Sequence, residues 1–245
     1  MSAEQTTTHT HIMRAGLLVE ESRAWWKNRT LTDQPDPAGN AFESYWFGMR
    51  SEARVQVLVR VLKSRFDQDP QALAVLRQWA DPAPEERALV CHWHIQISDP
   101  LYRAFSGALL PARRARGHIR QSQVVDWLEA GYPDRWATSS RLRLSSAMLS
   151  CAHHTGLLST TKDPRPLQLP RISDRALGYI LHLLRQTDHT GGILDNPYLS
   201  SVGLIGEILV GRLRRLPGLT YRRMGHLVEL DWQHDDLTSW AKATL

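Results

Sequence analysis

The chain has 245 residues and a formal net charge of +5 at pH 7, with 42% hydrophobic and 22% charged residues. This is the composition of an ordinary globular protein, long enough for one large domain or two small ones. The longest apolar runs, 55–62 and 202–210, are broken by charged residues and are far shorter than the roughly 20 residues that cross a bilayer. The first residues lack a secretory signal pattern, and two widely separated cysteines do not make a disulfide scaffold. We therefore expect a cytoplasmic protein with free thiols and no membrane contact.

The N-terminal part of the chain has helical periodicity. Residues 1–11 are polar and Thr-rich, so we expect them to be disordered. No alternating strand pattern occurs before residue 110, and residues 12–110 are predicted to form a helical bundle. The expected elements are a helix from Met13 to the Pro-rich linker around 33–39, and helices around 55–62, at 73–79, from Glu85 to about Ile97, and from Pro100 through Leu109.

Residues 111–188 are predicted to form a winged helix-turn-helix. Gly131 and Pro133 stop a first helix, and Thr138 is the expected N-cap of a second. The turn-forming stretch 162–165 is the expected tip of a hairpin. The predicted elements are helices at 122–130, from Thr138, and at 176–185 after Ser173 and Asp174, and strands at 157–160 and 167–169.

The last part of the chain, residues 189–245, repeats the order of helix then hairpin. After a break at 190–196, we expect a helix over about 199–216. A second hairpin is predicted from segments 219–223 and 226–232 around Met224-Gly225, with Val228, Leu230 and Trp232 on one face, and a last helix from Asp235 and Asp236. The sequence thus predicts a mainly α fold with a bundle, a winged helix-turn-helix and a C-terminal helix-and-hairpin unit.

Positive charge is concentrated in the window from Arg113 to Arg171. The window holds ten basic and four acidic residues, and its balance of +6 exceeds the +5 of the whole chain. The rest of the chain is therefore slightly acidic. Such local positive charge is what a surface that faces phosphates requires.

The helix from Thr138 has a polar face that favours contact with a polyanion. Leu142, Leu149 and Ala152 are expected to share a buried stripe with Ser145, which leaves short hydroxyls and arginines exposed. A helix in a major groove uses its N-terminal residues for base edges and phosphates, and a hairpin tip reaches the adjacent backbone. The predicted DNA-contacting residues are Arg113, Arg114, Arg116, Arg120, Thr138, Ser139, Ser140, Arg141, Arg143, Lys162 and Arg165.

These charges leave two interpretations open. A basic, solvated face on an ordinary helical domain has the same pattern. A second basic cluster also lies late in the chain, where it could extend a nucleic-acid footprint or serve a protein partner. Its members are Arg212, Arg214, Arg215, Arg222 and Arg223.

Several segments resemble, in order and spacing, the BrxA family of BREX phage-defence systems. The resemblance covers roughly Met13 to Arg185, and the pattern of a helix followed by a strand ending in tryptophan at 199–232 is also similar to that family. The segments are Gly16 to Arg23, Trp136 with Thr138, Arg141-Leu142, Met148-Leu149, Gly156-Leu157-Leu158, Pro170 to Asp174, and Ala176-Leu177.

What this resemblance implies is a small, largely helical accessory protein without enzymatic activity of its own. It implies a bundle like that of the antitermination factor NusB and winged-helix features that bind DNA. The implied DNA surface maps onto the helix from Thr138 and the hairpin near Arg165. The implied partners are double-stranded DNA and the other BREX subunits, including a methyltransferase and an ATPase.

Cysteine and histidine lie three apart in two places, Cys91 to His94 and Cys151 to His154. This spacing puts both side chains on one helix face, as in a zinc site. Both pairs lie within apolar helical patterns, where cysteine is a small core residue, so we favour a structural role. Neither pair has the elbow or orienting acid of a cysteine nucleophile, and no Gly-rich phosphate loop occurs. We predict no cofactor, no metal and no catalytic residue.

The sequence therefore favours a non-enzymatic accessory protein that binds duplex DNA, mainly through phosphates. The alternative is a protein-interaction scaffold whose basic face docks other subunits of the defence complex. A third option is RNA binding, suggested by the antitermination-like bundle.

Overall fold

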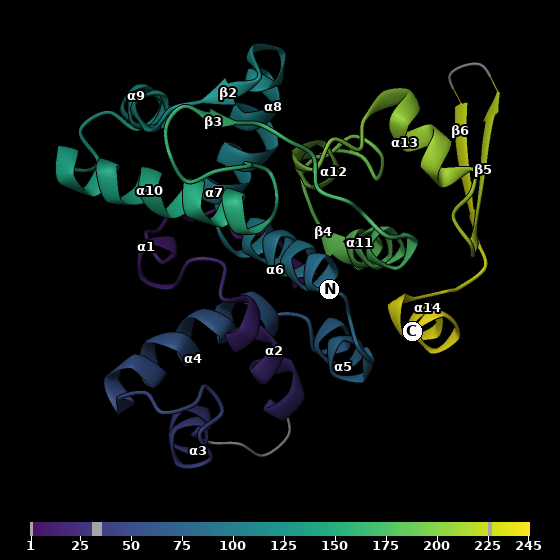
Figure 1. The fold of residues 1–245 in the computed structure, drawn as a ribbon. Coiled ribbons are helices and arrows are strands. Elements are labelled where there is room, and N and C mark those ends of the chain that lie inside the picture. Colours follow the sequence, from purple (N-terminus) through teal and green to yellow (C-terminus); the bar gives the residue numbers. More distant parts are fainter. Residues whose placement is uncertain (1, 31–35, 225–226) are drawn as a thin grey trace.

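The computed structural model describes residues 2–30, 36–224 and 227–245, and the fold is mainly helical, as predicted. Helix α6 (Pro84–Ser98) lies at the centre, with the other helices arranged around it (Figure 1). Every side chain of α6 from Ala88 to Ser98 is buried, as expected of a helix inside a core. Buried hydrophobic residues form one cluster that extends from Ile12 to Ala241, and partly buried residues such as Leu167 and Trp232 pack against it. The predicted domain boundaries stay predictions.

Most helices of the N-terminal part lie below α6 in Figure 1, and the first lies to its left, beneath α10. The single helix predicted from Met13 is in fact two, because Gly16 and Leu18 have φ values of +47° and +57° and a right-handed helix cannot pass through that conformation. The end of the predicted linker is helical, because Asp36 caps a helix that begins at Pro37. Residues 33–35 of the linker lie outside the described residues. The helices are α1 (Ile12–Ala15), α2 (Val19–Asn28), α3 (Pro37–Glu43), α4 (Glu52–Phe66) and α5 (Pro70–Gln78).

The middle of the chain contains two helices joined by a turn at the predicted positions. The helix expected from Pro100 continues through a π-helical turn to a 3₁₀ turn, and Gly117, with a φ of +72°, ends it. The elements are α7 (Pro100–Ala104), η1 (Phe105–Leu109), α8 (Leu110–Arg113), η2 (Arg114–Arg116), β2 (His118–Ile119), α9 (Gln121–Gly131), α10 (Thr138–His154) and β3 (Arg165–Pro166).

The C-terminal part confirms the second hairpin, β5 (Leu219–Met224) with β6 (Leu227–Trp232), whose connecting residues 225–226 lie outside the described residues. The predicted helix over 199–216 is broken, because Gly203 has a φ of +81°, which a right-handed helix does not contain. Leu169 packs close to this glycine, so that an added Cβ would lie 2.6 Å from it. The other elements are α11 (Asp174–Gln186), β4 (Thr187–Asp188), α12 (Pro197–Ser201), α13 (Gly206–Leu213) and α14 (Leu237–Thr244).

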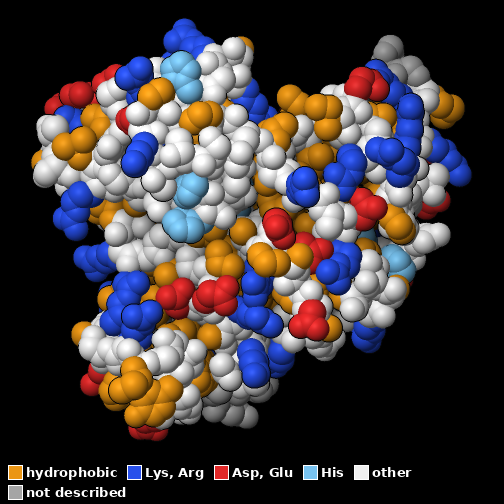
Figure 2. Space-filling model, in the orientation of Figure 1, with side chains coloured by type: hydrophobic (Ala, Val, Ile, Leu, Met, Phe, Trp, Pro, Cys, Tyr) orange, Lys and Arg blue, Asp and Glu red, His pale blue; other side chains and the backbone are white. Residues whose placement is uncertain are grey.

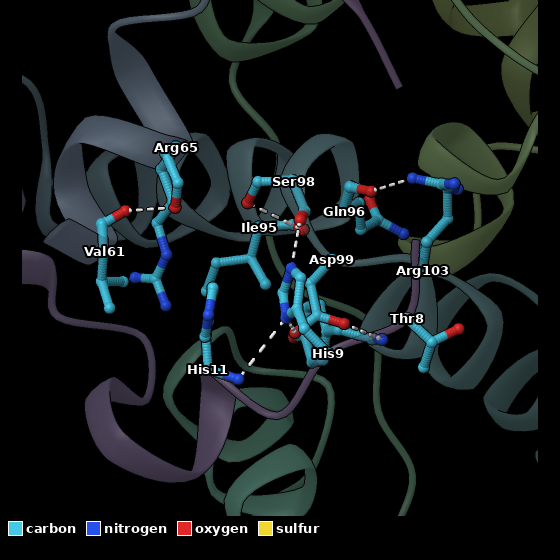
Figure 3. Close-up of polar contacts among 12 residues, drawn as sticks. Thr8, His9, His11, Val61, Arg65, Ile95, Gln96, Ser98, Asp99 and Arg103 are labelled. Carbon is cyan, nitrogen blue, oxygen red and sulfur yellow. Dashed lines mark hydrogen bonds and ion pairs between the residues drawn. The ribbon is translucent and has the colours of Figure 1, made fainter. Parts of the chain in front are cut away.

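Residues 2–11 are ordered against the core, so the predicted disorder is wrong for this segment. Strand β1 (Ser2–Ala3) pairs in parallel with β4. The Glu4 carboxylate accepts a hydrogen bond from the Tyr198 hydroxyl at 2.7 Å. Figure 3 shows His9 between α6 and α7, with Nε2 2.8 Å from the Ser98 carbonyl oxygen and Nδ1 3.6 Å from Asp99 Oδ2. Glu4 is thus held by α12 and His9 by the C-terminal end of α6, and the sequence pattern does not reveal such long-range partners.

Within the three described ranges, no helix is long and apolar enough to cross a membrane.

The packing of α14 on α11 is tested at Gly178. An added Cβ there would lie 2.8 to 2.9 Å from atoms of the buried Trp240 indole. We expect Gly178→Ala to lower the free energy of unfolding by about 1–3 kcal/mol, because overpacking outweighs the gain in helix propensity. Gly131→Ala is the matched control, since a Cβ there meets no atom within 4 Å, and it should be neutral or stabilising. Urea denaturation of both variants measures the difference, and equal stabilities would contradict this packing.

Candidate nucleic-acid interface

Helices α9 and α10 pack against each other beside a small β arrangement. The predicted hairpin is present, because Leu158 and Leu167 form an antiparallel bridge. Its second strand also pairs with β2, a strand that precedes α9, so that His118 lies opposite Pro166 and Ile119 opposite Arg165. The order of elements is therefore strand, helix, helix and hairpin. We call residues 157–168 the first hairpin.

Gln121, the first residue of α9, links the first hairpin to α10. Its backbone N–H donates to Asp163 Oδ2 at 2.8 Å, which fixes the hairpin tip. Its side-chain amide donates to the Leu142 carbonyl at 3.2 Å, and also to the Ser145 and Ser146 hydroxyls at 3.1 and 2.8 Å, all on α10. These contacts bring the hairpin tip, the start of α9 and the first half of α10 to one surface. Sequence reasoning missed Gln121, because a glutamine at a helix start has no distinctive pattern.

The solvent-facing side of α10 is an open stripe of two serines, a leucine and an arginine. Ser139, Leu142, Arg143 and Ser146 are all exposed on it. Leu142 was expected in the buried stripe but is 46% exposed, because the buried side is centred on Leu144 and Met148 rather than on the neighbouring positions. The expected burial of Ser145, Leu149 and Ala152 is confirmed.

The first turn of α10 has no side-chain cap. Thr138 is the first helical residue and not the N-cap, which is Ala137. Thr138 and Ser139 are exposed, and Ser140 is half-buried. The first N–H groups of α10 are therefore not covered by a capping side chain.

Helix α1 forms the other border of the open stripe. A pocket of about 420 Å³ is lined by Met13 of α1 together with Leu142, Arg143, Ser146 and Ala147 of α10. The accessible part of α10 therefore lies between the first hairpin on one side and α1 on the other.

Three of the predicted DNA-contacting arginines are engaged within the protein. Arg141 was expected to be exposed but is only 9% exposed, with its guanidinium 3.2 Å from Glu129 Oε1 on α9. The Arg165 side chain is also largely buried and pairs with Asp163 at 2.8 Å. Arg114 donates to the Ser201 carbonyl at 2.7 Å. The spacing in the sequence cannot distinguish such internal partners from solvent.

The other five basic residues of the predicted set lack such partners. Within the described ranges, no hydrogen bond or ion pair engages the charged end of any of them. Arg120 precedes Gln121, Lys162 precedes Asp163, and Arg143 follows Leu142, so three of them flank residues joined by the Gln121 contacts. The five are Arg113, Arg116, Arg120, Arg143 and Lys162.

The two Cys and His pairs do not converge. Both ring nitrogens of His94 are used, Nδ1 with the Arg65 carbonyl at 3.1 Å and Nε2 with the Tyr179 hydroxyl at 2.7 Å. His154 is exposed on α10. Among the residues that the structure describes, no group of three or more His, Cys, Asp or Glu is placed to hold a metal ion.

The buried thiols are poorly suited to nucleophilic chemistry. Burial raises the pKa of Cys91 to about 11 and that of Cys151 to about 12, so both are protonated thiols at neutral pH. Burial also lowers the pKa of His94 to about 4, which keeps its imidazole neutral. These groups are part of the core.

The contrast between Arg141 and Arg143 is directly testable. We expect Arg141→Ala to lower the free energy of unfolding by about 1–2 kcal/mol, because it removes an ion pair between α9 and α10 and the packing of the side-chain stem. The exposed Glu129 limits the effect. Arg143 lies two residues further along α10 and is exposed. Arg143→Ala should therefore change the free energy of unfolding by less than about 0.5 kcal/mol. Thermal and urea unfolding check this, and equal stability of the two variants would contradict the placement of Arg141.

Comparison with known proteins adds a similarity of fold. No family model and no curated protein matches the chain. Among solved structures, it is similar to the crystal structure of an uncharacterized protein from Magnetospirillum magneticum, with a TM-score of 0.57 and 17% sequence identity. The match covers 73% of this chain and 94% of that chain. At this identity the two proteins share a fold, and the comparison extends no further.

Proposed function

We propose that this protein is a non-enzymatic accessory protein that binds duplex DNA through α10 and the first hairpin. The observation that carries the proposal is the set of contacts made by Gln121, which gathers Arg120, Arg143 and Lys162 around one open stripe of α10. Basic side chains without protein partners are available to phosphate oxygens, which dominate the affinity of proteins for DNA.

The chemistry of the open stripe suits close approach to a groove. Short hydroxyls such as that of Ser139 keep the helix backbone near its ligand and can hydrogen-bond to phosphates or base edges. The Ser146 hydroxyl accepts from Gln121 and donates to the Leu142 carbonyl, so its role is to hold this surface together. The exposed Leu142 side chain is of the kind that contacts a thymine methyl group. The uncapped first turn of α10 offers backbone N–H groups to a phosphate.

The resemblance to the BrxA family supplies the biological setting of the proposal. In that setting the DNA-bound protein works beside the other BREX subunits, including a methyltransferase and an ATPase. Enzymatic steps would then belong to those partners.

The proposed surface is tested by removing its three central charges. We expect the triple variant Arg120→Ala, Arg143→Ala and Lys162→Ala to bind a labelled duplex about 10- to 100-fold more weakly at physiological salt. The slope of log affinity against log salt should become shallower by about 2–3, because each lost phosphate contact contributes about 0.9. Fluorescence anisotropy titrations at salt concentrations between about 50 and 200 mM measure both the affinity and its salt slope, because binding through phosphates weakens steeply over this range.

The matched control removes the same charge from the bundle. Lys27, Arg50 and Lys63 are exposed on α2, the loop before α4, and α4. Their triple replacement by alanine should leave affinity and slope near those of the wild type. An equal loss in both variants would show that net charge, and not this surface, determines binding. No binding of the wild-type protein to any duplex at low salt would overturn the proposal, and co-purification of defence-complex subunits that survives nuclease would then favour the scaffold.

A further inference from the structure

The C-terminal unit, α12, α13, β5 and β6, repeats the layout of α9, α10 and the first hairpin. In both units two helices joined by a turn are followed by antiparallel strands. The two units lie on opposite sides of the upper part of the molecule in Figure 1.

Direct contacts fasten the two units to each other. Arg114, in the turn before β2, donates to the Ser201 carbonyl of α12 at 2.7 Å. Arg212 of α13 donates to the Ile172 carbonyl at 2.8 Å, in the segment that follows the first hairpin. Because half-buried guanidinium groups bridge the units at both points, the C-terminal unit holds a fixed position relative to α10.

Three arginines of the C-terminal unit present charge to solvent. Arg214 and Arg215 are exposed just after α13, and within the described part of the chain neither has an ion-pair partner. Arg215 Nε donates to the Gly211 carbonyl at 3.1 Å, and its guanidinium remains exposed to solvent. Arg222 on β5 lies 4.0 Å from Glu229, and both side chains are more than 60% exposed, so this pair is weak. Figure 2 shows Lys and Arg side chains gathered over α13, β5 and β6.

The helix α13 lacks the exposed serine hydroxyls that α10 has. Its start exposes Ile205 by 51% and Ile208 by 60%, and Glu207 between them is also exposed. Unlike α10, α13 has no serine or threonine that could hydrogen-bond to DNA, and the acidic Glu207 repels phosphates. A contact made by this unit would therefore come from the arginines beyond the end of α13 and on β5, and would reach phosphates rather than bases.

We propose that Arg214, Arg215 and Arg222 form a second contact site for the phosphate backbone of the same duplex. This inference rests on the proposed function, since it adds a second site to the DNA surface of α10. The second site positions the duplex and carries no sequence information, because guanidinium groups bind phosphates irrespective of base.

The test uses the full-length chain and a labelled duplex. The triple variant Arg214→Ala, Arg215→Ala and Arg222→Ala should bind about 10-fold or more weakly, with a salt slope shallower by about 2–3. The corresponding lysine variant should retain the wild-type slope, because lysine also neutralises phosphates. The Lys27, Arg50 and Lys63 variant serves as the charge-matched control, and circular dichroism confirms that each protein is folded.

The possible outcomes separate this inference from the proposed function. If the wild type binds DNA and the C-terminal triple variant binds with unchanged affinity and slope, the second site is wrong and the α10 surface stands. If the C-terminal triple variant keeps its DNA affinity and slope but loses a co-purifying protein, these arginines belong to a protein interface, and the inference is overturned. If the wild type does not bind duplex DNA, both fail. A weaker, shallower titration for the alanine variant, restored by lysine, supports the second site.

Discussion

The hydrogen bonds of Gln121 are the interaction on which the candidate interface depends. Each of the strands β2 and β3 contributes two residues to their ladder, and so short a ladder orients the tip of the first hairpin only weakly. The N–H of Gln121 fixes that tip through Asp163, and its side-chain amide reaches the Leu142 carbonyl of α10. One residue thus sets the position of the basic hairpin tip relative to the polar helix. Leu142 and Ser146 belong to the open stripe, so these hydrogen bonds join the stripe directly to the start of α9.

Hydrogen bonds between buried polar side chains of the core support this surface. Helix α6 carries His92, whose ring nitrogens lie 2.9 Å from the Tyr102 and Ser201 hydroxyls, and His94, which bonds Arg65 and Tyr179. Burial lowers the pKa of His92 to about 3, so it is neutral and acts as a hydrogen-bonding spacer. These bonds tie α7, α12 and α11 to α6, because buried polar networks that are fully satisfied specify one arrangement of helices. The N-terminal segment adds to this order, since the Arg135 guanidinium between α9 and α10 donates to the Thr8 carbonyl.

Local patterns predicted the fold class and most helices, because amphipathic spacing and capping residues act over a few residues. Ser173 caps α11 as expected, and α4, α5 and α6 lie where the apolar periodicity places them. The breaks at Gly16 and Gly203 were missed, because a glycine inside an apolar pattern does not show whether its φ is positive.

The candidate site was predictable as a region but not residue by residue. The +6 window located α9, α10 and the first hairpin. The division of its arginines into engaged and free ones depends on partners such as Glu129 and Ser201, which lie on other helices. The exposure of Leu142 depends on the rotation of α10 in the core, which tertiary packing sets. Charge in the sequence therefore indicated the region of the candidate interface. The structure shows which of its basic residues have partners within the protein.

The most direct measurement places a photo-crosslinking side chain at position 142, in the middle of the open stripe, and irradiates the protein with a duplex. Met49, which is 91% exposed in the bundle, provides the control position. If α10 lies in a groove of DNA, position 142 will crosslink to bases of the duplex and position 49 will not. Crosslinks from position 49 alone, or none from position 142 in a protein that binds the duplex, would contradict the assignment of α10 as the DNA-contacting helix.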